Sequence, residues 1–327
     1  MWQRGIKSAE NNILALGFFD GVHRGHQYLL GEAYRLAQEE KAKLHIFTFY
    51  PHPRNFLSSE EVKHILTYRE KYCLIQELFP QSLLQFVRFN KSFREMTAQE
   101  FLTLVEQEIR PRGVVVGENF RFGFQAQGDA QLLKNHLSFR GIEVTVVPSL
   151  REGGELISSS RIRWHLESGD LLSANRLLGY SFFLEGRVRR GKGVGRKLGF
   201  PTANLYPPSY KLLPASGVYT GYVSGKEIGE RNPSLIYVGH RPTVNFSPRR
   251  LVEVFIPEVS RELYGERLTI EFQAFLREEM VFPSLSELKN QIEQDLEALR
   301  ITTEQSAISP FHHCEHGAER GEQATFS

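Results

Sequence analysis

Apolar, strand-like runs alternate with segments of helical spacing through the first half of the chain. The apolar runs occur at 13–18, 44–49, 84–86, 113–116 and 143–147, and helical spacing occurs over 27–39, 67–79, 97–109 and 129–139. Continuous apolar runs joined by helices of this length are typical of a parallel sheet covered by helices. The sequence therefore predicts an α/β domain whose ligands bind at the carboxyl ends of the strands.

The pattern changes near residue 182, where shorter β-like runs begin. Two short helices are expected first, at 159–168 and 171–178, and the β-like runs follow at 182–189, 217–223, 234–238, 251–255 and 268–275. Glycine, proline and asparagine separate these runs, as in a small antiparallel barrel, and helical spacing returns over 284–300. We expect one domain over 1–182, a barrel domain over 183–302 and a mobile tail over 303–327.

Composition narrows the classes of partner and the cellular compartment. The net charge of +2 is too small to predict a basic face for nucleic acid. The two cysteines, Cys73 and Cys314, are far apart and predict no disulfide framework. No apolar run reaches membrane-spanning length, and the first residues lack the apolar core of a signal peptide. We expect a cytoplasmic protein that binds neither nucleic acid nor membrane.

A His-x-Gly-His motif, His23 to His26, follows the first predicted strand through an Asp-Gly turn. Gly25 lets the backbone approach a phosphate, and the N-terminus of the next helix offers unpaired N–H groups. Two imidazoles can donate hydrogen bonds to oxygens that gain charge as a phosphorus atom is attacked. Ordinary loop histidines are the alternative, but the strand-to-helix context favours nucleotidyl transfer. The predicted phosphate-binding residues here are Gly17, Phe18, Asp20 and Gly25.

Three further segments of the first half carry candidate ligand-binding residues. Serines at the start of a helix cap its N–H groups, but two arginines in the same turn favour β- and γ-phosphates; the residues are Ser158, Ser159, Ser160, Arg161 and Arg163. Two strand ends carry aromatic, proline and amide groups that could bind a planar ligand or pack a loop. These residues are Phe49, Pro51, His52, Pro53, Asn119 and Phe122.

A second glycine-rich motif opens the barrel half and ends in Pro-Thr-Ala-Asn. Its glycines permit N–H groups to face an anion, and its constrained positions are Gly191, Gly193, Gly195, Gly199 and Pro201. Thr202 and Asn204, two residues apart on an extended strand, point to the same side and suit Mg²⁺ bound to nucleotide phosphates. A flexible hairpin is the alternative, which the length and order of the motif disfavour.

Phosphoryl transfer to an alcohol also needs a carboxylate beside the hydroxyl. Glu253 lies among apolar neighbours on a predicted strand and is the candidate general base. The alternative for any single glutamate is a solvated surface charge.

Together these motifs resemble those of the bifunctional bacterial riboflavin kinase/FAD synthetases. The matching strings are FFDGVHRGH, TFYPHP, GENFRFG, ISSSRIR, GRKLGFPTANL, GHRPT, VEV and ELYGERL. The string GFPTAN is highly specific to flavokinases, whereas HxGH is shared with many nucleotidyltransferases. The resemblance implies a nucleotidyltransferase domain of Rossmann-like fold, followed by a six-stranded flavokinase barrel with an appended helix.

The same resemblance implies two ATP-dependent reactions and a set of residue roles. Riboflavin and ATP with Mg²⁺ would give FMN at the barrel, and FMN with a second ATP would give FAD and pyrophosphate at the first domain. The adenylylation site would contain His23, His26, Asn119, Ser158 to Ser160, Arg161 and Arg163, with Phe49, Pro51, His52, Pro53 and Phe122 near the flavin. Thr202 and Asn204 would hold Mg²⁺, and Glu253 would accept the proton of the ribityl 5′-hydroxyl.

The chain departs from the family pattern at three places. Many relatives carry histidine where Arg190 and Phe255 stand, and the tail has no expected counterpart. The tail holds His312, His313, Cys314 and His316, whose spacing matches no structural zinc pattern. Two alternatives to a two-step enzyme are an FMN adenylyltransferase with an inactive barrel and a non-enzymatic flavin sensor. Intact HxGH and PTAN motifs favour the enzyme.

Overall fold

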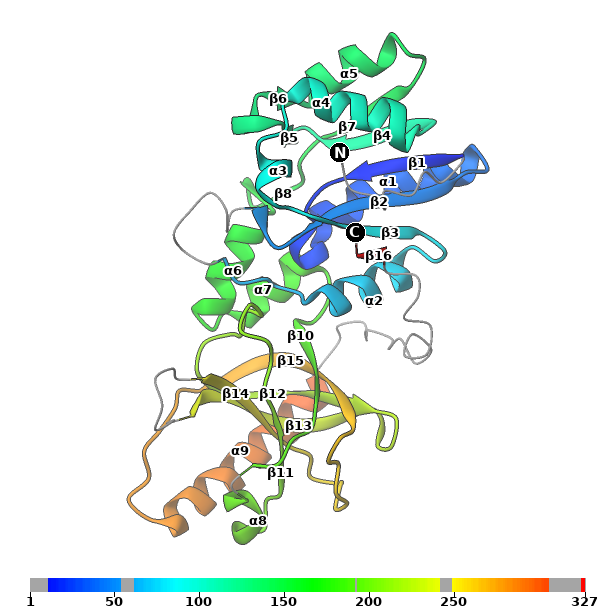
Figure 1. Ribbon diagram of the computed structural model, residues 1–327. Coiled ribbons are helices and arrows are strands. Elements are labelled where there is room, and N and C mark those ends of the chain that lie inside the picture. The colour runs from blue at the N-terminus through cyan, green and yellow to red at the C-terminus, as the bar shows by residue number, and fades with distance from the viewer. Residues whose placement is uncertain (1–10, 54–61, 192, 242–248, 306–324, 327) are drawn as a thin grey trace. The chain divides into compact units, whose positions relative to one another are not determined.

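The computed structural model describes residues 11–53, 62–191, 193–241, 249–305 and 325–326. The chain divides into two compact units (Figure 1). The first unit contains residues 1–64, 71–158 and 316–327, and the second contains 65–70 and 159–315.

The first unit is built on a six-stranded parallel sheet in the order β16-β3-β2-β1-β4-β7. The strands are β1 (Asn12–Leu16), β2 (Lys43–Tyr50), β3 (Leu83–Arg88), β4 (Gly113–Gly117), β7 (Glu143–Val147) and β16 (Thr325–Phe326). Every residue of β1 is buried, because β1 lies in the middle of the sheet. The predicted parallel sheet is confirmed, and the tail adds β16 to one edge.

Helices connect the parallel strands. They are α1 (Arg24–Glu39), α2 (Tyr68–Leu78), α3 (Lys91–Arg94), α4 (Ala98–Thr103) and α5 (Ala130–Ser138), with a π-helical turn at Leu104–Ile109. The segment expected to form one helix over 97–109 therefore changes its winding after Thr103. Short 3₁₀ turns form at Asp20–Val22 and Phe124–Ala126, and two small hairpins pair β5 (Arg121–Phe122) with β6 (Gly128–Asp129) and β8 (Arg151–Glu152) with β9 (Glu155–Leu156).

The second unit is a curled antiparallel half-barrel in the order β10-β15-β12-β13-β14-β11 (Figure 1). Its strands are β10 (Phe183–Arg187), β11 (Thr202–Leu205), β12 (Gly217–Gly225), β13 (Gly229–Arg241), β14 (Arg249–Phe255) and β15 (Arg267–Arg277). Its helices are α6 (Ser159–Glu167), α7 (Leu171–Leu178), α8 (Val194–Leu198) and α9 (Leu285–Gln305). Helix α9 packs against β13 and β12. The predicted antiparallel barrel with its C-terminal helix is confirmed.

Helices α6 and α7 group with the barrel strands, although they precede residue 182. The Asn175 side chain on α7 explains part of this, since its Nδ2 donates to the Phe272 carbonyl at 3.0 Å and its Oδ1 accepts from the Phe182 N–H at 2.7 Å. Both bonds are buried, so they connect the helix directly to the barrel.

Three further expectations from the sequence concern Cys73, the tail residues and membrane-spanning helices. Cys73 is a buried residue of α2. The tail residues His312, His313, Cys314 and His316 lie outside the described residues. Among the helices that the structure describes, none is both long and apolar enough to cross a membrane.

Candidate active sites

The two histidines of the first motif lie at the N-terminus of α1, directly after the 3₁₀ turn. His23 is the N-cap residue, and its Nδ1 accepts a hydrogen bond from the His26 N–H at 3.3 Å. The two imidazoles stack, with ring centroids 3.6 Å apart and an interplanar angle of 17°. A neutral His23 whose Nδ1 accepts carries its proton on Nε2, so that nitrogen is a hydrogen-bond donor.

Burial gives His26 a neutral ring. Burial is the largest cause that lowers its pKa well below the ordinary value of 6.5, and the charges of His23 and Lys71 lower it further. The Nδ1 atom of His26 is buried and has no hydrogen-bond partner in the described structure. A buried polar nitrogen without a partner suits a site that a ligand completes.

Close packing holds the chain that leads into this motif. A Cβ at Gly17 would lie 2.7 Å from the Phe19 ring, so that ring needs a glycine there. The Phe18 ring contacts His52 at 4.1 Å between centroids, and the Phe18 carbonyl accepts from the Thr48 hydroxyl at 2.8 Å. Asp20 is only 2% exposed. A Cβ at Gly25 would lie 3.3 Å from the His23 ring.

A row of aromatic rings runs through the first unit and includes both predicted flavin-site phenylalanines. The centroid distances are 5.2 Å from Phe49 to Phe93, 6.4 Å from Phe93 to Phe101 and 4.8 Å from Phe101 to Phe122. Phe122 is buried in the core, and Phe49 is half-buried beside it. The half-buried Phe49 ring is the end of this row that remains partly accessible.

The other predicted residues of the first site occupy loops and a helix start. Asn119 donates through Nδ2 to the Ser149 hydroxyl at 2.9 Å. Pro51 and Pro53 follow β2 and are half-buried. Ser158 closes the first unit, whereas the remaining four predicted phosphate-binding residues of this segment lie in α6, in the second unit: Ser159, Ser160, Arg161 and Arg163.

The second site is assembled by strand pairing. β11 runs antiparallel to β14, so Thr202 stands opposite Phe255 and Asn204 opposite Glu253. The Thr202 hydroxyl donates to Glu253 Oε2 at 3.3 Å, and Asn204 Nδ2 donates to the Thr202 carbonyl at 3.3 Å. A hydroxyl, an amide and a carboxylate from two strands therefore meet on one side of the sheet.

The glycine-rich motif contains a short helix, α8, which the sequence did not predict. Gly193 and Gly199 flank it with φ values of 70° and 89°, a backbone region in which glycine is the favoured residue. A Cβ at Gly191 would lie 2.5 Å from Asn204 Oδ1, and one at Gly195 would lie 2.3 Å from the Phe200 carbonyl oxygen. Two of these glycines are thus needed for close approach and two for the turns.

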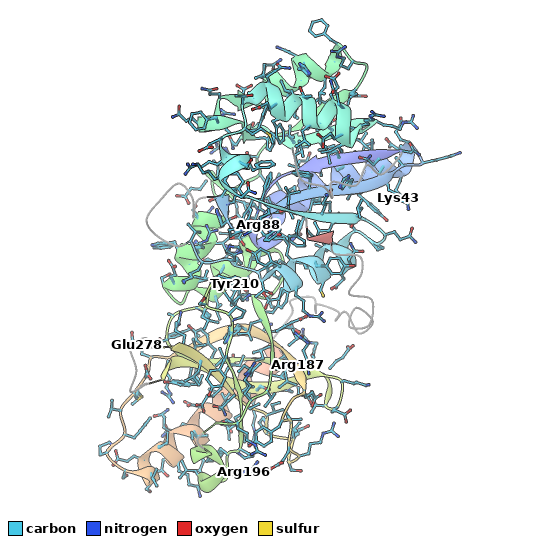
Figure 2. The ribbon with its side chains drawn as sticks, in the orientation of Figure 1. Lys43, Arg88, Arg187, Arg196, Tyr210 and Glu278 are labelled. Carbon is cyan, nitrogen blue, oxygen red and sulfur yellow. The ribbon has the colours of Figure 1, made fainter. Side chains whose placement is uncertain are left out.

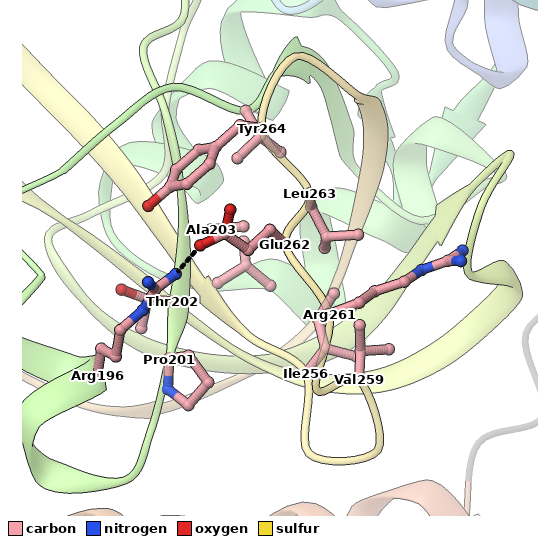
Figure 3. A pocket seen from close by; sticks show the side chains of 12 residues that line it. Arg196, Pro201, Thr202, Ala203, Ile256, Val259, Arg261, Glu262, Leu263 and Tyr264 are labelled. Atoms are coloured by element: carbon pink, nitrogen blue, oxygen red, sulfur yellow. Dashed lines mark hydrogen bonds and ion pairs between the residues drawn. The ribbon is translucent and has the colours of Figure 1, made fainter.

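An open pocket lies beside Thr202 (Figure 3). Arg196, which Figure 2 labels on α8, bonds Glu262 at 2.9 Å across this pocket. Tyr264 also lines the pocket, and the Arg190 guanidinium lies 5.6 Å from the centroid of the Tyr264 ring. Phe255 packs edge-on against Phe200 at 5.4 Å. Arg190 and Phe255 thus make aromatic contacts beside the site.

Comparisons with known proteins match both units. The profile of the FAD synthetase family matches residues 5–161, and that of the riboflavin kinase family matches residues 178–303. A bifunctional riboflavin kinase/FMN adenylyltransferase from Escherichia coli K12 is 36% identical over 88% of this chain and 91% of its own length. The enzyme of that name from Bacillus subtilis is 34% identical over 88% of this chain and 92% of its own length.

The chain belongs to the bifunctional riboflavin kinase/FMN adenylyltransferase family. A crystal structure from Streptococcus pneumoniae, described as a macrolide-efflux protein, shares the fold with a TM-score of 0.81 and 29% identity, over 90% of this chain and 95% of that one. The FAD synthetase profile includes His23 and His26, and the riboflavin kinase profile includes Thr202, Asn204 and Glu253.

The structure also shows three residues near these sites that sequence reasoning missed: Tyr237, Glu279 and Lys71. Tyr237 stands opposite Glu253 in the pairing of β13 with β14, and its hydroxyl bonds Glu279. Burial is the largest cause that raises the Tyr237 pKa, followed by Glu279 and then by Glu253, so Tyr237 stays a neutral donor. Lys71 is fully buried beside Phe18. Only Lys71 had a sequence signal, because it shares a helical face with the apolar residues at 74 and 75.

Proposed function

We propose that this family member phosphorylates riboflavin to FMN in its barrel unit and adenylylates FMN to FAD in its parallel-sheet unit. Each reaction consumes one ATP, and the second releases pyrophosphate. The observation that carries the proposal is that two family profiles match separate stretches of one chain, each with a complete set of reactive groups. We propose an adenylyltransferase domain over 1–182, whose last two helices group with the second unit, and a kinase domain over 183–302. We also propose a cytoplasmic location, where ATP is available to both reactions.

In the kinase reaction, Glu253 accepts the proton of the ribityl 5′-hydroxyl. The bond from that oxygen to the γ-phosphorus forms as the bond from the γ-phosphorus to the β-phosphate oxygen breaks, and ADP leaves. The Thr202 hydroxyl donates to Glu253 and holds the carboxylate in place. A general base of this kind contributes about 10²–10⁴ in rate, and positioning supplies much of the rest.

The donor set around Thr202 suits Mg²⁺. Thr202 Oγ1 and Asn204 Oδ1 are hard oxygen ligands, which this ion prefers. Among the described residues, no group of three or more His, Cys, Asp or Glu side chains is arranged to hold a metal ion. From the oxygen chemistry of these two side chains, we propose that Thr202 and Asn204 hold the Mg²⁺ that enters with ATP. When bound, the ion neutralises charge on the phosphates.

In the adenylylation, a phosphate oxygen of FMN attacks the α-phosphorus of ATP, and the bond from that phosphorus to the pyrophosphate oxygen breaks. The attacking phosphate is already ionised, so no proton has to be removed. His23 and His26 lie at a helix N-terminus, where they and the N–H groups of the first helical turn donate hydrogen bonds to the developing charge. We propose that Ser158 to Ser160, Arg161 and Arg163 bind the outer phosphates, and that the aromatic row binds the flavin.

A single assay tests the proposal. Purified protein is incubated with ATP, Mg²⁺ and riboflavin, or with FMN in place of riboflavin, and the flavins are separated by chromatography. We expect FMN to appear first and FAD to follow. FMN without FAD would remove the claim for the first unit. FAD formed only from supplied FMN would leave an adenylyltransferase with an inactive barrel, and neither product would leave a flavin sensor.

A further inference from the structure

A row of side chains crosses the second site from strand to strand. Asn204 on β11 stands opposite Glu253 on β14, and Glu253 stands opposite Tyr237 on β13. Residues that stand directly opposite each other in antiparallel strands have their side chains on the same face, with Cβ atoms about 5 Å apart. The proposed kinase reaction uses the first two of these side chains and gives Tyr237 no role.

Packing and a hydrogen bond together hold the Tyr237 side chain in this row. Its half-buried ring packs against the apolar cluster of Val218, Leu235 and Leu299. Its hydroxyl donates to Glu279 Oε1, in the segment between β15 and α9. Burial is the largest cause that raises the Tyr237 pKa, so the hydroxyl keeps the proton that it donates. The Glu279 carboxylate is thereby held beside the row.

The hydrogen-bonded pair of Tyr237 and Glu279 is rich in acceptors. The phenolic oxygen donates its single proton to the carboxylate and keeps its lone pairs for accepting. A carboxylate has about four lone-pair sites on its two oxygens, and the bond from the phenol occupies one of them. Such a pair suits a ligand that carries several hydroxyl groups, because each hydroxyl can donate to an acceptor of the pair.

The geometry of phosphoryl transfer brings a hydroxylated chain to this pair. The attacking and leaving oxygens lie roughly in line, on opposite sides of the γ-phosphorus. Thr202 and Asn204 take the phosphate side of the proposed reaction, on β11, and Glu253 meets the attacking 5′-hydroxyl. The rest of the ribityl chain then extends away from β11, and the next strand in that direction is β13. Its three remaining hydroxyls therefore pass over Tyr237.

We propose that Tyr237 and Glu279 bind the hydroxyl groups of the ribityl chain and select flavins that carry them. The inference deepens the proposed kinase function and rests on it. A different role for Tyr237 would be to orient Glu253. The two roles differ in one respect: orientation of the base affects every flavin substrate equally, whereas recognition of the ribityl hydroxyls affects only flavins that have them.

A second substrate separates these roles. It is a flavin with a plain hydroxypentyl side chain, which keeps the ring and the terminal hydroxyl and lacks the other three hydroxyls. Tyr237→Phe and Glu279→Ala are assayed for phosphorylation of this flavin and of riboflavin. Glu278→Ala is the control for the exposed neighbouring carboxylate (Figure 2). Tyr219→Phe is the control for a lost tyrosine hydrogen bond, since the Tyr219 hydroxyl donates to the Ala215 carbonyl at 2.6 Å.

We expect the unaltered protein to prefer riboflavin over the hydroxypentyl flavin on the order of 10²-fold in kcat/KM, because the analogue leaves the acceptors without donors. Tyr237→Phe and Glu279→Ala should each lower kcat/KM for riboflavin on the order of tenfold. Neither variant should change kcat/KM for the hydroxypentyl flavin or KM for ATP. Tyr219→Phe and Glu278→Ala should keep the full preference.

Two results would overturn the proposal. The first is an unaltered protein that phosphorylates both flavins equally well. The second is a Tyr237→Phe or Glu279→Ala protein that keeps the full preference, whether it is fully active or equally slowed with both flavins. If Tyr237→Phe is too unstable to assay, Glu279→Ala decides, because Glu279 is exposed. Failure of the kinase assignment is distinguishable, since the unaltered protein would then form no FMN, and the inference would fall with it.

Discussion

At the scale of single residues, burial decides the protonation state of His26. Its pKa lies well below 6.5 because burial, His23 and Lys71 all disfavour the charged ring. The ring is therefore neutral at pH 7 and can donate one hydrogen bond. Because the folded pKa is below the unfolded value, the contribution of His26 to the free energy of unfolding is complete above about pH 6.5 and is lost as the pH falls toward the folded pKa.

This protonation state predicts a titration. In protein without ATP, the His26 imidazole should remain neutral as the pH falls from 8 through 6.5, measured by the ¹⁵N chemical shifts of the ring. Adding ATP should raise the pKa, because a nearby negative charge favours the imidazolium. A midpoint at or above 6.5 without ATP would contradict the buried environment described for this ring.

At the scale of elements, the glycine-rich segment shows a conflict between helix propensity and packing. Gly195 lies inside α8, where alanine is ordinarily favoured by about 1 kcal/mol. A Cβ there would lie 2.3 Å from the Phe200 carbonyl oxygen, a backbone atom that cannot move alone. The Gly195 carbonyl accepts a hydrogen bond from the Phe200 N–H at 2.8 Å. This bond holds α8 and the Pro-Thr-Ala-Asn strand in one arrangement.

We therefore expect Gly195→Ala to lower FMN formation at least about tenfold while FAD formation from FMN is retained. Gly31→Ala is the matched control, because Gly31 lies in α1 and its Cβ would meet no atom within 4 Å. That variant should keep both activities and gain about 0.5–1 kcal/mol in free energy of unfolding. Equal kinase activity in the two variants would show that the α8 contact is dispensable.

A buried ion pair connects the segment at 65–70 to the barrel within the second unit. Lys211 Nζ donates to Glu70 Oε2 at 2.8 Å, to the Ile65 carbonyl at 2.7 Å and to the Phe183 carbonyl at 2.9 Å. The Lys211 and Glu70 side chains are 0% and 1% exposed. Removing one partner leaves the other charge buried and unpaired, which is far more costly than removing both.

Lys211→Met should accordingly lower the free energy of unfolding by about 3–5 kcal/mol, and adding Glu70→Gln should recover part of that loss. Urea unfolding followed by circular dichroism measures both changes. Glu297→Gln is the control, since its ion pair with Arg300 is exposed and should contribute nothing measurable. A Lys211→Met protein as stable as the control would mean that the pair is not a structural requirement.

At the scale of the whole molecule, the chain carries two sets of reactive groups in two units. His23 and His26 belong to the first unit, and Thr202, Asn204 and Glu253 belong to the second. Glu253→Gln should therefore abolish FMN formation and spare FAD formation from FMN. His26→Ala should do the reverse. An equal mixture of the two variants should again convert riboflavin to FAD, because FMN released by one molecule serves the other.

Chromatography of the products measures this complementation, with each variant alone as its control. Glu258→Gln, an exposed carboxylate near the end of β14, should change neither reaction. Loss of both reactions in one folded variant would contradict two independent sites.

Local patterns in the sequence determined the element types and the reactive motifs. Buried runs such as β1 and β4, the amphipathic face of α1 and the constrained glycines are encoded by neighbouring residues, because strand and helix periods are short. The motifs that indicate the two reactions can be recognised from the sequence for the same reason, because each motif is a contiguous run of residues.

Tertiary structure alone decided which distant residues meet. Glu253 reaches Thr202 only because β11 and β14 pair in one register, and Tyr237 faces Glu253 only through the pairing of β13 with β14. Lys71 acquires a lowered pKa only when α2 buries it beside Phe18. Strand register and burial depend on contacts between residues far apart in the chain, and no local period encodes those contacts.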